Sequence, residues 1–153
     1  MILGILLLLG SSSLTHAAGG EIGNAFVRFD SRIGHFTVEY ADNWRVNDLS
    51  DATSFNETSP TSSEASFFAV EVESGVAEDL PGLGARIKEL RPDVTWTPTT
   101  VGGVPGFRGA DKTAQMIYLF RGPNDQLLLR MRATDGTKSE QVLSHMLETF
   151  RTD

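Results

Sequence analysis

The chain has 153 residues, a formal net charge of −7 and no cysteine, and 40% of its residues are hydrophobic. The negative charge argues against nucleic acid and anionic membranes as partners. The absence of cysteine excludes disulfides, thiol catalysis, cysteine-based metal sites and lipid attachment through cysteine. The hydrophobic content and the length indicate one folded domain that can bury a core.

The first 17 residues have the pattern of a secretory signal peptide. Met1–Gly10 consists almost entirely of Leu, Ile and Gly, and is too short to span a bilayer as a stable anchor. Thr15 and Ala17 then occupy the positions expected before cleavage at Ala18. No Lys or Arg precedes the apolar run, so an uncleaved membrane-associated segment is the alternative. We expect an exported protein, periplasmic or secreted, in which residues 18–153 form a single domain without stable membrane insertion.

Strands are predicted for the first part of this domain. Glu21–Ser31 is expected to form a short strand, and Phe36–Tyr40 alternates in the manner of a half-buried strand. Trp44 follows a break and is expected to pack in the core. Leu49–Ser63 is polar, which predicts a short edge strand and an exposed loop. The expected core side of the first strand consists of Ala25, Val27 and Phe29.

A strand and a helix are predicted next. Ala65–Glu73 has one apolar face, and its other face changes from apolar to charged at Glu71 and Glu73. The segment Asp79–Leu90 is predicted to be a helix, because Asp79 can cap it, Pro lies in its first turn and apolar residues recur at helical spacing. Val94–Val101 contains a proline and is therefore expected to be an edge or irregular strand.

A β-hairpin and a closing helix complete the pattern. Gln115–Arg121 and Gln126–Thr134 flank four turn-forming residues, and placing Arg121 opposite Gln126 gives one wholly apolar face. The expected core residues of that face are Met116, Tyr118, Phe120, Leu127, Leu129 and Met131. The helix begins at Thr137 or Ser139, and its apolar stripe comprises Val142, Leu143, Met146, Leu147 and Phe150. Together these elements predict an α+β fold, with an antiparallel sheet of about six strands flanked by helices in an α/β/α sandwich.

The order of these motifs resembles the PsbP-like family. The opening pattern of that family, aromatic–x–aliphatic–x–Tyr–x–x–x–Trp, is similar to FTVEYADNWRV, and the later motifs are similar to ASFFAVEVE, GGVPGF and HMLETF. The resemblance covers Phe26–Phe150 and implies an antiparallel sheet between helices. The family includes extrinsic photosystem II subunits, a nuclear-import factor that binds a small GTPase, and exported bacterial domains. Ala41–Asn43 lacks the proline that the family has before its Trp, which favours the wider superfamily over the photosystem branch.

No catalytic motif was found in the sequence. There is no nucleophile elbow, no His-Glu-x-x-His and no phosphate-binding loop. His145 and Glu148 have the spacing of two metal ligands on a helix, but a second ligand cluster is missing, so a surface pair is the default interpretation. We therefore expect no enzyme activity, no cofactor and no metal. A hydrolase with an unrecognised site is the enzymatic alternative.

Charged residues on the predicted sheet provide the candidate site. Glu71 and Glu73 share a face with apolar residues, and so do Arg130 and Arg132, so these four charges could pair across the sheet as a solvent-facing ladder. The functional alternative is a half-apolar, half-charged groove beneath the middle helix. The candidate binding residues are Glu71, Glu73, Trp96, Phe107, Arg130 and Arg132.

These observations lead to two functional expectations. The first is a non-catalytic exported domain that binds a protein partner, as an accessory or assembly factor of the cell envelope. The alternative is a small-molecule-binding protein that uses the mixed face of the sheet. The sequence does not indicate the identity of the partner or the oligomeric state.

Overall fold

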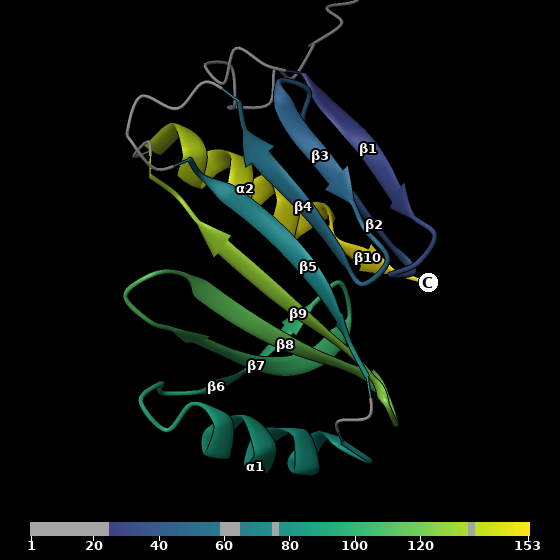
Figure 1. Cartoon of the computed structure of the whole chain (residues 1–153), viewed down its shortest axis with the longest axis vertical. Coiled ribbons are helices and arrows are strands. Elements are labelled where there is room, and N and C mark those ends of the chain that lie inside the picture. Colours follow the sequence, from purple (N-terminus) through teal and green to yellow (C-terminus); the bar gives the residue numbers. More distant parts are fainter. Residues whose placement is uncertain (1–24, 59–64, 75–76, 135–136) are drawn as a thin grey trace, which may run out of the picture.

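The computed structural model describes residues 25–58, 65–74, 77–134 and 137–153 (Figure 1). The predicted signal peptide lies outside the described residues. Within those ranges, no helix is both long enough and apolar enough to cross a membrane.

Two antiparallel sheets form most of the domain. The larger has seven strands in the order β3-β4-β5-β9-β8-β7-β6, and the smaller has three in the order β1-β2-β10. The strands of the larger sheet are β3 (Trp44–Asp48), β4 (Ala52–Glu57), β5 (Phe67–Glu73), β6 (Thr97–Val101), β7 (Val104–Ala110), β8 (Gln115–Gly122) and β9 (Asp125–Arg132). The strands of the smaller sheet are β1 (Phe26–Ser31), β2 (Phe36–Ala41) and β10 (Arg151–Thr152).

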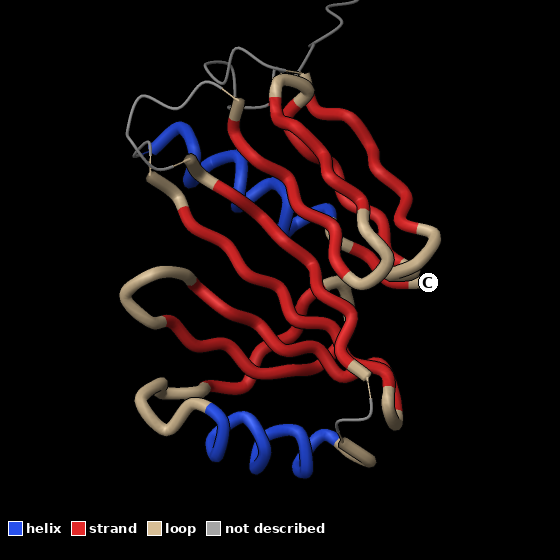
Figure 2. Tube along the Cα trace, viewed as in Figure 1, coloured by secondary structure: helices blue, strands red, loops and turns tan. Residues whose placement is uncertain are grey.

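Two helices cover opposite faces of the seven-stranded sheet at opposite ends. Helix α1 (Leu80–Leu90) lies beside β6, β7 and β8, whereas α2 (Thr137–Thr149) lies behind β4, β5 and β9 together with the small sheet (Figures 1 and 2). The predicted α+β sandwich is therefore confirmed, with seven strands in the main sheet where about six were expected. Each half of the sheet has one covered face.

Two apolar clusters correspond to these two covered faces. The α2-side cluster contains the fully buried aromatic residues Phe36, Phe55, Phe68 and Phe150 and the apolar stripe of α2. The α1-side cluster consists of Leu83, Ile87, Val94, Trp96, Met116 and Leu128. Burying an apolar side chain stabilises the fold by about 1.5–3 kcal/mol before entropy is subtracted, so the α2-side cluster contributes most of the core.

The local signals of helix α1 are confirmed. Asp79 caps the helix, because its Oδ1 accepts a hydrogen bond from the Gly82 N–H at 2.7 Å, and Pro81 lies in the first turn. Leu83 and Ile87 are buried, but Leu90 remains 56% exposed. The amide of Arg91 closes the helix by donating to the carbonyl of Ile87.

The N-terminal strands differ from the sequence-based expectation in two places. The segment expected to form an edge strand and a loop contains β4, an internal strand between β3 and β5, and the edge of the sheet is β3 instead. In β1, Phe26 and Phe29 are half-buried, whereas Val27 is 41% exposed. Phe29 lies on the expected core side and packs against Phe55, with 5.3 Å between ring centroids. Phe26, on the other face, is half-buried because its ring stacks on His145.

The predicted register of the β8–β9 hairpin was wrong by one residue. Gly122 pairs with Asp125, and an irregularity lies between Phe120 and Gly122, so Arg121 bulges out of the ladder. Asn124 adopts a φ of 57°, as a tight turn requires. Consequently, Ile117 and Leu119 share the α2-side core with Leu127, Leu129 and Met131. Met116, Tyr118 and Phe120, which were expected on that face, point to the α1 side instead.

The bulge directs Arg121 into a structural contact. Its guanidinium donates to the carbonyls of Gly34 and His35 at 2.5 and 3.1 Å, and to Asp125 Oδ1 at 2.6 Å. The side chain is only 9% exposed. This arginine therefore connects the β1–β2 turn to the β8–β9 hairpin, and these contacts stabilise the bulged conformation of Arg121.

Candidate functional site

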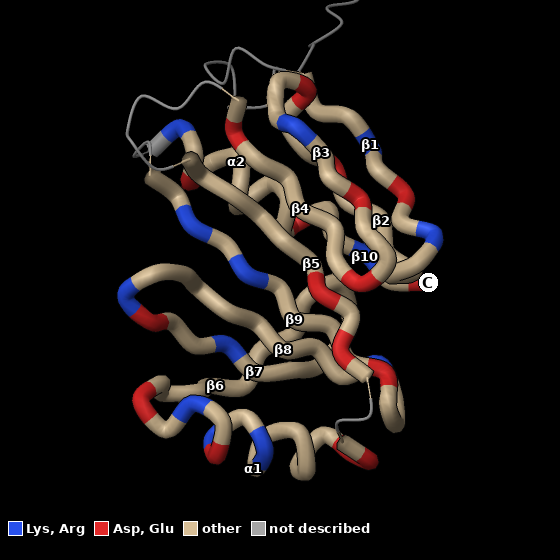
Figure 3. The backbone as a smooth tube through the Cα atoms, viewed as in Figure 1, with Lys and Arg blue, Asp and Glu red and all other residues tan. Residues whose placement is uncertain are grey.

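The structure places β5 and β9 side by side, as the charge-pairing hypothesis required. Arg130 Nη1 lies 3.4 Å from Glu71 Oε1, with side-chain exposures of 42% and 33%. An exposed pair of this kind contributes about 0.2–1 kcal/mol. Figure 3 shows basic positions along β9 and acidic positions at one end of β5.

Glu73 lies beyond this ion pair, opposite Gln126 of β9. Burial raises the pKa of Glu73, the neighbouring charge of Glu71 raises it further, and Arg86 of α1 opposes the change. The two glutamates therefore repel each other where the sheet approaches α1. Gln126 is fully buried there, and its Nε2 donates to the carbonyls of Ala77 and Gly122.

Arg132 lies at the other end of β9, opposite Phe67. Its guanidinium carbon is 5.2 Å from the centre of the Phe67 ring, which is a cation–π geometry. Phe67 is half-buried. The arginine therefore lies over an aromatic surface rather than extending directly into solvent.

The two predicted aromatic site residues lie near α1, on the part of the sheet that this helix covers. Trp96 is 9% exposed and packs edge-on against Tyr118, with 5.6 Å between ring centroids. Phe107 packs against α1 so closely that a Cβ added at Gly84 would lie 2.8 Å from its Cζ atom. Phe107 also lines a cavity of about 450 Å³ at the sheet edge, together with Pro98.

The uncovered part of this face lies at the other end of the sheet. Strand register places two adjacent rows of side chains there, and each row takes one residue from each of β3, β4, β5 and β9. We define the open face by these eight residues: Arg45, Asn56, Phe67, Arg132, Asn47, Ser54, Ala69 and Arg130. All eight are half-buried or exposed. The set contains three arginines and no carboxylate, although the whole chain carries a net charge of −7.

Charged contacts hold α1 over its own half of the sheet. Arg91, just after the helix, donates to Asp93 and to Asp111, each at 2.9 Å. Asp111 Oδ1 also accepts from the amide and the hydroxyl of Thr113 at 2.7 Å. The Thr113 hydroxyl and the Arg91 guanidinium hold the pKa of Asp111 well below its usual range. The end of α1 is thus tied to the β7–β8 turn, away from the open face.

His145 makes a different contact from the proposed pair with Glu148. Its Nε2 lies 2.9 Å from Glu39 Oε2, and its ring stacks on Phe26 with 3.7 Å between centroids. Within the described residues, no group of three or more His, Asp or Glu side chains could hold a metal ion. His145 therefore helps to join α2 to the small sheet.

Half of the open face was not predicted from the sequence. Arg45 and Asn47 lie on β3, and Ser54 and Asn56 lie on β4. The segment that holds β4 was expected to be only a short edge strand and a loop, because its polar residues resemble a loop. Thr53 and Phe55, which alternate with these polar residues and are buried, were the available signal for a strand.

Comparisons with known proteins inform the fold alone. No family model matches this chain, and no curated protein matches it. The structure is similar to a crystal structure of a protein from Bacteroides thetaiotaomicron VPI-5482, with a TM-score of 0.54 and 11% identity over 82% of this chain and 48% of that one. The present chain thus spans about half the length of the Bacteroides protein.

A second similar structure is the Saccharomyces cerevisiae Ran-binding protein Mog1p. It has a TM-score of 0.47 and 11% identity, over 84% of this chain and 96% of that one. This likeness is too distant to support an inference about the present chain.

Proposed function

We propose that this chain is a non-catalytic, exported domain of the PsbP-like type that binds an acidic segment of a partner protein through the open face. The observation that carries the proposal is the composition of that face, with three arginines and no carboxylate on an otherwise acidic chain. The motif order that resembles the PsbP-like family supports the classification, and the signal-like N-terminal sequence supports export.

The chemistry of the open face suits a protein segment that carries carboxylates. Arginine presents a planar fork of donors that matches a carboxylate, and Phe67 and Ala69 offer apolar surface between Arg45 on one side and Arg130 on the other. Asn56 and Ser54 add neutral hydrogen-bonding groups, which already bond to each other at 3.0 Å. Arginine and aromatic residues are enriched at protein interfaces.

The direct test compares the affinities of two sets of short peptides for this chain. One set is acidic and each peptide contains an aromatic residue, and the matched set has Lys in place of Glu and Asp. Fluorescence anisotropy would compare the wild-type chain with Arg45→Glu and Arg130→Glu. We expect the chain to bind the acidic peptides in preference to the basic ones. Each substitution should weaken the affinity for the acidic peptides by about tenfold or more, because the new glutamate faces the carboxylates of the peptide.

Arg108→Glu is the matched control. Arg108 is exposed on β7, and its pairing with the buried Ile117 places it on the opposite face of the sheet. It should change peptide affinity by less than about twofold. Arg130→Glu also removes an ion pair with Glu71, so that variant alone does not separate lost binding from altered folding. Arg45 lies on an exposed edge strand, and Arg45→Glu therefore provides the cleaner test of binding. Equal binding of acidic and basic peptides, or equal losses in Arg45→Glu and Arg108→Glu, would overturn the proposal.

A further inference from the structure

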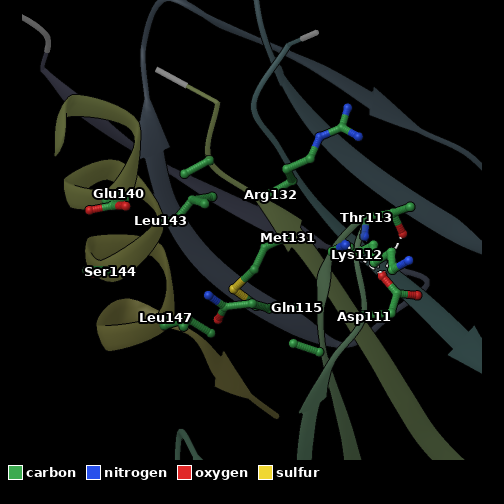
Figure 4. A pocket seen from close by; sticks show the side chains of 13 residues that line it. Asp111, Lys112, Thr113, Gln115, Met131, Arg132, Glu140, Leu143, Ser144 and Leu147 are labelled. Atoms are coloured by element: carbon green, nitrogen blue, oxygen red, sulfur yellow. Dashed lines mark hydrogen bonds between the residues drawn. The ribbon is translucent and has the colours of Figure 1, made fainter. Parts of the chain in front are cut away.

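A second candidate site lies on the other face of the sheet, between α2 and the β7–β8 turn. A cavity of about 660 Å³ opens there (Figure 4). Its apolar lining comes from Met131 of β9 and from Leu143 and Leu147 of α2. This volume lies within the range of about 300–1,000 Å³ that is typical of small-molecule sites.

The wall opposite α2 is held in place before any ligand arrives. Asp111 Oδ1 accepts hydrogen bonds from the amides of Thr113 and Ala114, at 2.7 and 2.9 Å, and its Oδ2 accepts from Arg91. Ala114 is buried, whereas Lys112 is exposed at the tip of the turn. A fixed wall reduces the ordering cost of binding.

Four polar side chains around the cavity have no partner within the described part of the chain. Gln115 and Lys112 belong to the wall, and Ser144 and Glu140 belong to α2. All four are exposed, and none makes a side-chain hydrogen bond or an ion pair with another described residue. Figure 4 shows Lys112 and Glu140 on opposite sides of the cavity.

The arrangement specifies a class of ligand. A positive group on one wall and a negative group on the other complement a molecule with a carboxylate at one end and an ammonium at the other. Between them, the apolar lining consists of the half-buried Leu147 together with Met131 and Leu143, which are 2% and 7% exposed. A nucleotide fits poorly, because its phosphates would meet the carboxylate of Asp111 beside Lys112, with Glu140 across the cavity.

We propose that this cavity binds a short apolar peptide with free termini. The peptide carboxylate faces Lys112, its ammonium faces Glu140, and its side chains lie on Met131, Leu143 and Leu147. Gln115 and Ser144 hydrogen-bond to the peptide backbone. Arg132 belongs to both sets of lining residues, but its guanidinium lies over Phe67 on the side of the sheet that carries the open face. The residues assigned here to the peptide are not part of the open face, so either assignment can fail without the other.

The experiment uses trileucine with free termini and two capped forms, one acetylated at the N-terminus and one amidated at the C-terminus. Calorimetry would give affinities, and the methyl resonance of Met131 would report the location, with those of Met116 and Met146 as internal references. We expect each cap to weaken binding to the wild-type chain by about tenfold, since each removes one charged contact.

Two substitutions assign each terminus to its partner. In Lys112→Gln, amidation should no longer weaken binding, and in Glu140→Gln, acetylation should no longer weaken it. Lys138→Gln and Glu148→Gln are matched controls, because both residues are exposed on α2 and neither lines the cavity. They should retain the wild-type response to both caps.

Three results would overturn this assignment. One is the absence of trileucine binding, and another is saturation without a shift of the Met131 methyl resonance. The third is equal affinity of the free and capped peptides. Arg130→Glu, which tests the open face, should leave trileucine affinity unchanged.

Discussion

The two halves of the seven-stranded sheet are covered on opposite faces and by cores of different size. The half formed by β3, β4, β5 and β9 is covered by α2 and the small sheet, which together enclose a cluster rich in phenylalanine. The half formed by β6, β7 and β8 is covered by α1 over a smaller cluster around Leu83, Ile87 and Trp96. The central strands β8 and β9 are covered on both sides, because Ile117 and Leu119 are buried on the α2 side and Met116 and Leu128 on the α1 side. Accessible faces therefore remain toward the two ends of the sheet, and the position of each cover determines where the candidate binding surface lies.

The largest loss of stability is expected from a core substitution in the half of the sheet that α2 covers. Phe55 is fully buried and contacts Phe29, Tyr40 and Phe68, with ring centroids 5.1–6.2 Å apart, so it joins the two sheets. Phe55→Ala should lower the free energy of unfolding by about 3–5 kcal/mol, as large-to-small core substitutions do. Urea denaturation would measure the change. Phe55→Leu should cost clearly less, and equal losses in both variants would contradict a role based on packed volume.

A smaller and more local effect is expected in the α1 half. Ile87 is 1% exposed beneath α1, and Ile87→Ala should cost about 2–5 kcal/mol. Because this cluster is small, we expect amide hydrogen exchange to accelerate more in α1 than in β4 and β5. Leu90→Ala is the control, because Leu90 lies on the same helix and is 56% exposed. Uniform acceleration across the protein would show that the two halves unfold as one unit.

The smallest change in stability is expected from removing the charge of Glu73, at the boundary between the two halves. Burial and the charge of Glu71 raise the pKa of Glu73, so the folded state holds the proton more tightly than the unfolded state does. The associated stability is present below the unfolded pKa and is lost as pH rises through the folded pKa. Glu73→Gln should therefore stabilise the protein by about a few tenths of a kcal/mol at neutral pH, after allowance for solvent screening.

Thermal unfolding across acidic to neutral pH would measure this difference. The advantage of Glu73→Gln should shrink as pH falls, because the wild-type carboxyl then becomes neutral as well. Glu78→Gln, at an exposed position before α1, is the control for removing a carboxylate and should change the stability at neutral pH by less than Glu73→Gln does. A Glu73→Gln variant that is less stable at neutral pH would indicate that the attraction of Arg86 outweighs burial.

Local signals predicted much of the architecture. The alternation of Phe36 and Val38, the cap at Asp79 and the apolar stripe of α2 all correspond to observed elements. These features depend on neighbours within a few residues, so they can be identified without knowledge of the tertiary structure. The candidate charges were found in the same way, because Glu71 and Arg130 interrupt otherwise apolar strand faces.

Features that depend on distant contacts could not be derived in this way. The β8–β9 register required the bulge at Arg121, and that side chain bonds to the β1–β2 turn more than eighty residues earlier. Both faces of this hairpin are partly apolar, because α1 covers one face and α2 the other. An apolar face therefore did not specify the register, although a hairpin with one solvated face would have allowed that inference.

The sequence by itself determined the kinds of element, the α+β class and the acidic, cysteine-free composition, because all of these depend on residue type and short-range periodicity. Tertiary structure alone decided which half of each sheet face is covered. Strand pairing places Arg45 in one row with Asn56, Phe67 and Arg132, and the packing of α2 sets Lys112 across a cavity from Glu140. Helix placement depends on the sum of many packing contacts between distant segments, and binding surfaces lie where that packing leaves side chains accessible.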